Sequence, residues 1–169
     1  MTLNELITQF STTTENQAKA IFSTLFIACN RLQTLFDQHI PEVSLKQFML
    51  LSIAHQSETP LTLTQLGTML GCSRQNIRKL ADALTQKGFI TIQPSPHDAR
   101  ALTIFPTEKA RAYFQTVFPP YQAELQYLFE VYTPQEIETL FTLLSRLYAG
   151  IDHLEGRISH EHSQGPGSL

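Results

Sequence analysis

Apolar residues recur at intervals of three and four along most of this chain, which predicts a mainly α-helical protein. A short apolar stripe lies between Leu3 and Phe10. A longer one follows Thr14, and its members are Ala18, Ile21, Phe22, Leu25, Cys29, Leu32 and Phe36. A helix opening at Ser44 is apolar nearly all round, so we expect it to be central and buried. Thr133-Pro134-Gln135-Glu136 is a strong start for a further long helix.

Two shorter helices are predicted within residues 62–87. Thr62 and Gln65 match a capping box, and Gly71 ends the first helix after about two turns. Ser73 is the expected N-cap of the second helix. The turn between them is therefore only a few residues long, as a helix-turn-helix requires.

A β-hairpin is predicted directly after this helix pair. Residues 89–92 and 101–105 are β-rich, and prolines border the segment between them. The expected tip of the hairpin carries His97, Asp98 and Arg100. A helix pair followed by a basic-tipped hairpin is the plan of a winged helix-turn-helix, which reads the major groove with a helix and the minor groove with the hairpin.

The second helix of the pair carries side chains that can read bases. Arginine pairs with the guanine edge, asparagine and glutamine pair with adenine, and lysine suits a phosphate. The residues expected in the major groove are Ser73, Arg74, Gln75, Asn76, Arg78 and Lys79. The wing contacts are expected from His97, Asp98 and Arg100, and phosphate contacts from Thr62 and Thr64. A polar helix face is usually only solvated, but the preceding helix-turn geometry favours recognition here.

These segments resemble the MarR family of dimeric winged-helix transcriptional regulators. The resemblance is carried by residues 61–67, 70–76 and 80–90, by Asp98-Ala99-Arg100-Ala101, and by Thr107-Glu108-Lys109-Ala110. The Asp-x-Arg wing and the Thr-Glu-Lys helix start are its most specific parts, and the likeness extends from Glu15 to about His153. The chain departs from the family at Ala99, where a second wing arginine is common, and at Cys72, where Val or Ile is usual. The missing wing charge is expected to weaken non-specific DNA binding.

The charge of the chain is unevenly distributed. The 169 residues have a net charge of −3, but residues 62–111 hold seven basic and three acidic residues, a net charge of +4. The remainder holds five basic and twelve acidic residues, or −7. Basic charge therefore gathers in the predicted reading module, as expected for a DNA-binding protein. No apolar run approaches the roughly 20 residues of a membrane span and no signal-peptide pattern is present, so we expect a cytoplasmic protein without a membrane partner.

Four regions are predicted along the chain. They are N-terminal dimerisation helices in residues 1–43, a winged helix-turn-helix DNA-binding region in 44–106, C-terminal dimerisation helices in 107–155 and a disordered tail in 156–169. The terminal helices carry more apolar surface than so small a reading module covers, which predicts an isologous homodimer rather than a monomer. Two recognition helices would then lie about 34 Å apart and read a pseudo-palindrome. Pro119 and Pro120 are expected to break or kink the helix after the hairpin.

The expected function is that of a ligand-responsive repressor acting on double-stranded DNA. A bound dimer would occlude a promoter, and a small-molecule effector would change the angle between its reading modules. The resemblance implies an effector pocket near Phe36, His39 and Phe48 and a phenolic or other amphipathic effector. No cofactor, metal or enzymatic activity is expected, because catalytic motifs are missing and His160-Glu161-His162 falls in the predicted tail.

Two alternatives remain open at this point. Cys29 and Cys72 could make the chain a redox-sensing regulator, although both are expected to be small buried residues without a disulfide. In the other alternative the winged helix binds a protein instead of DNA, and the basic residues of the recognition helix and wing argue against it. An enzyme is a distant third.

Overall fold

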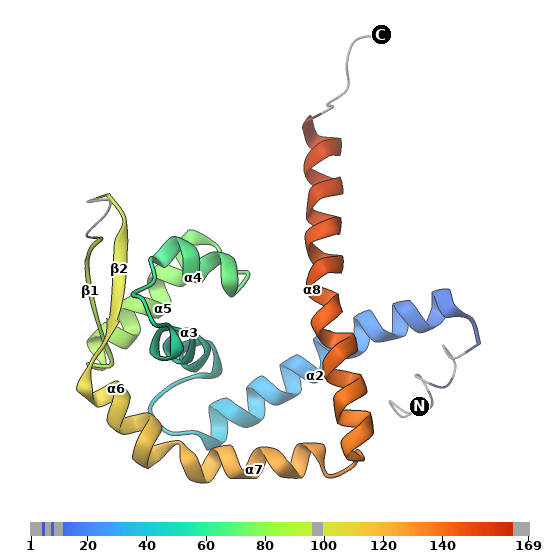
Figure 1. The fold of residues 1–169 in the computed structure, drawn as a ribbon, viewed down its shortest axis with the longest axis horizontal. Coiled ribbons are helices and arrows are strands. Elements are labelled where there is room, and N and C mark those ends of the chain that lie inside the picture. Colours follow the sequence, from blue (N-terminus) through green and yellow to red (C-terminus); the bar gives the residue numbers. More distant parts are fainter. Residues whose placement is uncertain (1–4, 6–7, 9–11, 96–99, 164–169) are drawn as a thin grey trace. The chain divides into compact units, whose positions relative to one another are not determined.

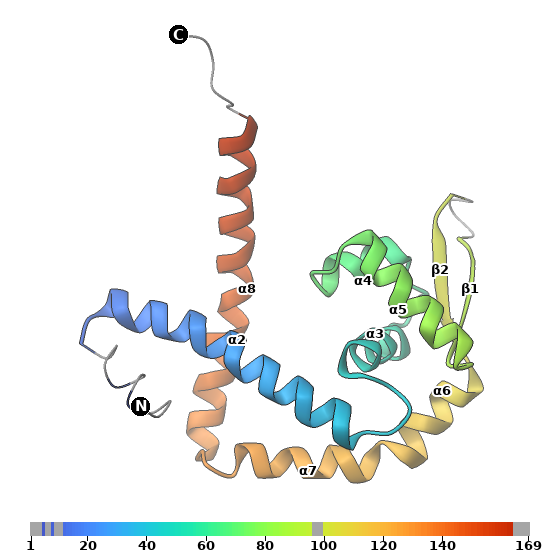
Figure 2. The same ribbon diagram turned by 180° about the vertical axis from the view of Figure 1, so that it is seen from behind.

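A computed structural model describes residues 5, 8, 12–95 and 100–163, with only the backbone of 161–163. The chain forms two compact units, Met1–Pro119 and Pro120–Leu169, which are described separately. Helices dominate, and one two-stranded hairpin lies in the first unit (Figures 1 and 2). The helix predicted at residues 3–10, except for Glu5 and Thr8, and the wing residues His97 and Asp98 lie outside the described residues.

The first long helix of the first unit, α2 (Thr14–His39), begins as its polar start predicts. The Thr13 hydroxyl caps it by accepting a hydrogen bond from the Asn16 amide. No residue of α2 is buried in the single chain, and about 60% of Phe22 and Phe26 is exposed. Cys29 is exposed as well, so the expectation that it is buried is wrong for the single chain, because its helix face is not covered.

Helix α3 (Leu45–Gln56) is central to the first unit, as its apolar sequence predicts. Ser44 and Gln47 close a capping box at its start. The helix buries Leu50, Leu51 and Ala54. The buried apolar residues that pack with them come from the segment just before the helix and from later segments as far as Tyr113: Val43, Leu63, Leu66, Ile77, Ala81, Leu84, Phe89, Ile90, Ile104, Ala110 and Tyr113.

Helices α4 (Leu63–Met69) and α5 (Arg74–Gln86) form the predicted helix-turn-helix. Thr62 and Gln65 complete the capping box of α4, and the Ser73 hydroxyl caps α5 by accepting from the Asn76 amide. Gly71 has a φ of 60°, the left-handed conformation that the turn between the helices needs. The sequence prediction is confirmed for both helices because their caps are local.

The hairpin consists of β1 (Ile90–Pro94) and β2 (Leu102–Pro106), each displaced by one residue or more from the predicted runs. The strands pair antiparallel, with Ile92 opposite Ile104. A second, shorter pairing was not predicted from the sequence. Thr62 and Thr103 form an isolated bridge, and the Ile104 amide donates to the Leu61 carbonyl at 3.0 Å. The hairpin is thus tied to the segment that begins α4.

The hairpin leads directly into α6 (Glu108–Ala112), which Figure 1 shows at the base of β2. A single π-helical segment, η1 (Tyr113–Val117), separates it from α7 (Pro119–Phe129). Neither proline can donate a backbone hydrogen bond, but both are tolerated in a first helical turn. The predicted break at Pro119 and Pro120 is therefore confirmed: regular α-helix stops before the prolines and restarts with them.

The second unit contains the rest of α7 and the long helix α8 (Pro134–Ser163). Thr133 and Glu136 cap α8 reciprocally, as predicted. The disordered tail predicted from residue 156 is wrong up to Ser163, because α8 continues through Gly156 at a cost of about 1 kcal/mol relative to alanine. Phe141 and Tyr148 are each 72% exposed. None of the helices in the described part of the chain has the length and apolar character needed to span a bilayer.

Candidate nucleic-acid interface

Most of the predicted DNA-reading residues converge on one hollow of the first unit, with a volume of about 860 Å³. Its lining residues are Leu63 and Thr64 from α4, Arg74, Gln75, Arg78 and Lys79 from α5, and Arg100, Ala101 and Leu102 at the start of β2. Four cationic side chains therefore face a space bordered by the recognition helix and the base of the wing. These residues are separated in the sequence, and they form one surface because the hairpin is hydrogen-bonded to the segment before α4.

Helix α5 presents its polar side because its apolar side is fully used. Ile77, Ala81 and Leu84 are buried against the core, which leaves the opposite side chains exposed. Arg78 and Lys79 extend from this exposed side into the lining of the hollow. The core of the first unit thus fixes which face of α5 is available to a nucleic acid.

Three residues predicted to contact DNA, Ser73, Thr62 and Asn76, do not line the hollow, and the hydroxyls of the first two cap helices. The Ser73 hydroxyl caps α5 at 3.3 Å from the Asn76 amide. The Thr62 hydroxyl accepts from the Gln65 amide at 3.2 Å and lies 2.9 Å from the Gln65 side-chain oxygen. Their contacts with DNA stay predictions, as do those of Asn76. Thr64, in contrast, lies in the lining.

Asp82 of α5 pairs with Arg78, a contact that was not predicted from the sequence. The Nε of Arg78 lies 2.9 Å from Oδ1 and 3.1 Å from Oδ2 of Asp82, one helical turn later. Both side chains are nearly half exposed. The spacing of four residues could have revealed this pair, because side chains at i and i+4 meet on a helix.

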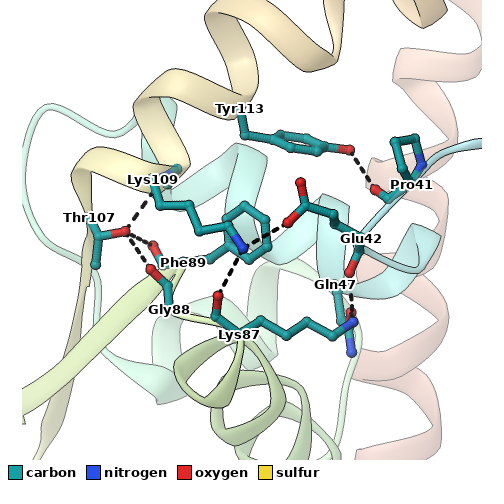
Figure 3. Close-up of polar contacts among 10 residues, drawn as sticks. Pro41, Glu42, Gln47, Lys87, Gly88, Phe89, Thr107, Lys109 and Tyr113 are labelled. Carbon is teal, nitrogen blue, oxygen red and sulfur yellow. Dashed lines mark hydrogen bonds and ion pairs between the residues drawn. The ribbon is translucent and has the colours of Figure 1, made fainter.

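The opposite end of α5 is anchored to a distant loop, as Figure 3 shows. The Lys87 Nζ donates to the Glu42 carbonyl at 2.7 Å and to the Gln47 side chain at 2.8 Å. The Lys109 Nζ forms an ion pair with the Glu42 carboxylate at 2.7 Å and donates to the Lys87 carbonyl at 3.1 Å. Two lysines therefore join the recognition helix, the segment before α3 and helix α6.

Further contacts in Figure 3 strengthen this anchor. The Thr107 hydroxyl donates to the Gly88 carbonyl at 2.7 Å, and the Tyr113 hydroxyl donates to the Pro41 carbonyl at 3.3 Å. Lys109 also lies over the ring of Phe89, 4.3 Å from its centroid. These partners are far apart in the sequence, so local patterns carried no signal for them.

The residues of the predicted effector pocket meet only in part. Phe36 and Phe48 have ring centroids 5.2 Å apart, and Phe48 also packs on Phe118 at 4.5 Å. His39, at the end of α2, is exposed. His55 stacks on Phe114 in the same aromatic group, at 4.6 Å. Because rings fill the space beside Phe48, an effector bound there would have to displace one of them.

The cysteine and metal predictions have different outcomes. Cys72 is half-buried, with its thiol 3.6 Å from the Leu70 carbonyl, while Cys29 is exposed. Among the residues that the structure describes, no three metal-ligating side chains gather at one place. The side chains of Glu161 and His162 lie outside that description.

The sequence model of the MarR family matches residues 43–102. Residues 43–102 therefore resemble a MarR family domain. This domain contains α3, α4, α5, β1 and the start of β2, and it includes every residue that lines the hollow. The predicted resemblance and the winged-helix fold class are both confirmed.

The similarity to individual known proteins covers more of the chain than residues 43–102. The transcriptional repressor MprA of Escherichia coli K12 is 29% identical over 106 residues, which are 63% of this chain and 60% of MprA, less than two thirds of the relative's length. A probable transcriptional regulator from Pseudomonas aeruginosa is 25% identical with a TM-score of 0.67, covering 75% of this chain and 96% of that one. The Staphylococcus aureus MepR–DNA complex shares the fold, with a TM-score of 0.67, 17% identity and coverage of 77% and 97%. MprA and the Pseudomonas aeruginosa protein are both named as transcriptional regulators.

Proposed function

We propose that this chain is a sequence-specific DNA-binding transcriptional regulator without catalytic activity. One observation carries the proposal: Arg74, Arg78 and Lys79 of α5 line the same hollow as Arg100 of the wing. A recognition helix and a wing that share one cationic space can contact a major groove and the neighbouring minor groove together. The local charge of +4 supports association with a polyanion despite the acidic remainder.

The chemistry of the lining supports the reading of bases as well as phosphate binding. Arg74 and Arg78 can each form paired hydrogen bonds with guanine, and Gln75 can do so with adenine. Lys79 and Thr64 are suited to phosphate oxygens. A purely electrostatic surface would not need the amide of Gln75. Base reading by α5 with Arg100 in a minor groove is therefore the arrangement we infer.

We also propose that the regulator is a cytoplasmic homodimer acting as a repressor on a pseudo-palindromic operator. The large apolar side chains exposed on α2, and separately those on α8, need a partner surface. A second copy of the chain offers the same surfaces, and an isologous dimer presents two recognition helices to two half-sites. MprA, the relative with 29% identity, is itself a repressor.

Release by a small amphipathic effector belongs to the same proposal. The aromatic group around Phe36 and Phe48 lies between the end of α2 and the start of α3, next to the DNA-reading helices in the chain. A ligand that displaces a ring there would bind one arrangement of these helices better than another. Only such a difference in affinity can shift the population of DNA-binding dimers.

Fluorescence anisotropy with the duplex upstream of the chain's own gene tests this function. We expect saturable binding with two protomers per duplex and a marked weakening as salt rises. The Arg78→Ala substitution should weaken binding about 5- to 150-fold, the range for losing a bidentate base contact. Arg100→Ala should weaken it less and reduce the salt slope by about 1.

The exposed Arg157 of α8 supplies the matched control, since Arg157→Ala removes one arginine outside the hollow. Its affinity should equal that of the wild type. Binding of random duplex as tight as of the upstream duplex, unaffected by either test substitution, would argue against the function at this site. A selection from a random DNA pool that enriches no sequence would then favour the protein-binding alternative.

A further inference from the structure

The pair formed by Arg78 and Asp82 fixes one edge of a base-reading arginine. Both carboxylate oxygens of Asp82 lie within 3.1 Å of Arg78 Nε. Among the described residues, the two terminal Nη groups of Arg78 have no hydrogen-bonding partner. The guanidinium is planar and rigid, so engaging Nε leaves the edge formed by the two Nη groups for a ligand.

The contribution of the Arg78–Asp82 pair to folding stability is too small to explain its presence. Half-exposed ion pairs spaced i and i+4 stabilise a helix only slightly. Asp82 is also the one acidic residue in α5, on the face that meets a polyanion. Its charge lowers the affinity for any duplex, whatever the sequence, because it repels phosphates. A residue that weakens binding in general and adds little stability can still contribute by improving discrimination.

We propose that Asp82 is a specificity-determining positioning residue that holds Arg78 for reading a base edge. With Nε occupied, Arg78 has fewer orientations in which to reach a phosphate, whereas its Nη edge keeps two donors for the paired acceptors of a guanine. Asp82 thereby increases the difference between a correct and an incorrect site. This inference rests on the proposed DNA-binding function.

The test compares Asp82→Ala with the wild type on two duplexes. One is the sequence that the wild-type protein enriches from a random pool, and the other is a scrambled duplex of equal length. We expect the substitution to tighten binding of the scrambled duplex several-fold, because a repelling charge is lost. The ratio of the two affinities should fall about fivefold to tenfold, because Arg78 loses its orientation.

Two controls separate orientation from charge. In an Arg78→Ala background, Asp82→Ala should leave the affinity ratio unchanged. Glu108→Ala removes another exposed carboxylate that pairs with an arginine, Arg111, at 2.9 Å, but outside the hollow. This control should leave the ratio at the wild-type value. Asp82→Glu, which keeps the carboxylate, should retain more discrimination than Asp82→Ala. Equal melting temperatures show that each variant is folded.

Each outcome decides the proposal. If Asp82→Ala tightens binding of both duplexes equally, the residue acts only through its charge and the positioning role is wrong. If it weakens both equally, its role is structural and the proposal also fails. If the wild-type protein enriches no sequence at all, the proposed sequence-specific DNA binding is wrong, and the role of Asp82 that depends on it is wrong as well. A wild type that discriminates and a variant that does not would establish the role of Asp82.

Discussion

Glu42 has a left-handed backbone conformation, with a φ of 68°, that non-glycine residues adopt only at a cost. Its surroundings compensate for this cost: the carbonyl accepts a hydrogen bond from Lys87 and the carboxylate pairs with Lys109. The ion pair is nearly half exposed, so its contribution to stability is small. Backbone conformation should therefore decide which substitutions the position tolerates.

Variants of Glu42 should separate the two contributions to folding stability. Glu42→Val should lower the free energy of unfolding by about 1–2 kcal/mol more than Glu42→Gln does, because a β-branched residue is strained at positive φ. Glu42→Gly should stay within about 1 kcal/mol of the wild type, since relief of strain offsets the lost ion pair. Urea unfolding at one protein concentration measures all three. Equal losses of stability in all three variants would show that the ion pair with Lys109, which each of them removes, dominates over backbone strain.

The sequence predicts single residues well where their contacts are local. Thr62 with Gln65, Ser73 and Gly71 act within a few positions of themselves, and the structure places each as expected. The partners of Lys87 lie 40 and 45 positions away, and no local pattern encodes such a contact. The convergence of Arg100 with α5 was predicted only because the order of a helix pair and a hairpin implies it.

At the scale of elements, the start of α8 depends on a carboxylate. Glu136 accepts hydrogen bonds from the Thr133 amide at 2.8 Å and hydroxyl at 3.0 Å. These bonds favour the charged form and lower the pKa of Glu136 below its ordinary value of 4.5. The folded protein therefore gains stability from this group above about pH 4.5 and loses it as the pH falls through the lowered pKa.

Thermal unfolding of Glu136→Gln should reveal this dependence. Near pH 7 the variant should melt below the wild type, because the charged acceptor at the helix N-terminus is lost. Near pH 3 the two melting temperatures should converge, because the wild-type carboxyl also becomes protonated. Glu138→Gln, an exposed change two residues later, should have little effect on the melting temperature. A difference between Glu136→Gln and wild type that is independent of pH would contradict this role of the carboxylate.

Elements with a regular spacing of apolar residues and clear capping or helix-breaking residues could be predicted from the sequence. Departures from regular secondary structure could not. The capping residues and glycines predicted the bounds of α4 and α5, and the two adjacent prolines predicted the interruption of the helix before α7. The π-helical segment from Tyr113 to Val117 has no sequence signature of its own. The end of α8 was misjudged because polar residues and one glycine suggest disorder, although a long helix tolerates both.

At the scale of the whole molecule, a folded single chain leaves large apolar side chains in water. Ile21, Phe22 and Phe26 of α2 are each about 60% exposed. The sequence indicated this surplus of apolar surface, but a single chain cannot show what covers it. We expect a second copy to do so, and a helix face with this much exposed aromatic surface should be sensitive to a single charge.

Phe22→Asp should convert the dimer into monomers, because burying an unpaired carboxylate in an apolar interface is costly. Sedimentation measures the association state, and anisotropy should show operator affinity falling about a hundredfold or more as the two half-sites are no longer bound together. Thr24→Asp, at an exposed polar position of α2 outside the apolar stripe, is the control and should stay dimeric. A Phe22→Asp protein that remains dimeric would place the interface elsewhere.

The bridge between Thr62 and Thr103 ties the start of α4 to the wing through backbone atoms. Because the link is made by backbone atoms, amino-acid substitutions there do not easily change its length. In the proposed function, this link should fix the distance between the major-groove and minor-groove contacts of one protomer. We therefore expect the length of DNA read within each half-site to be constant, whatever the distance between the two half-sites.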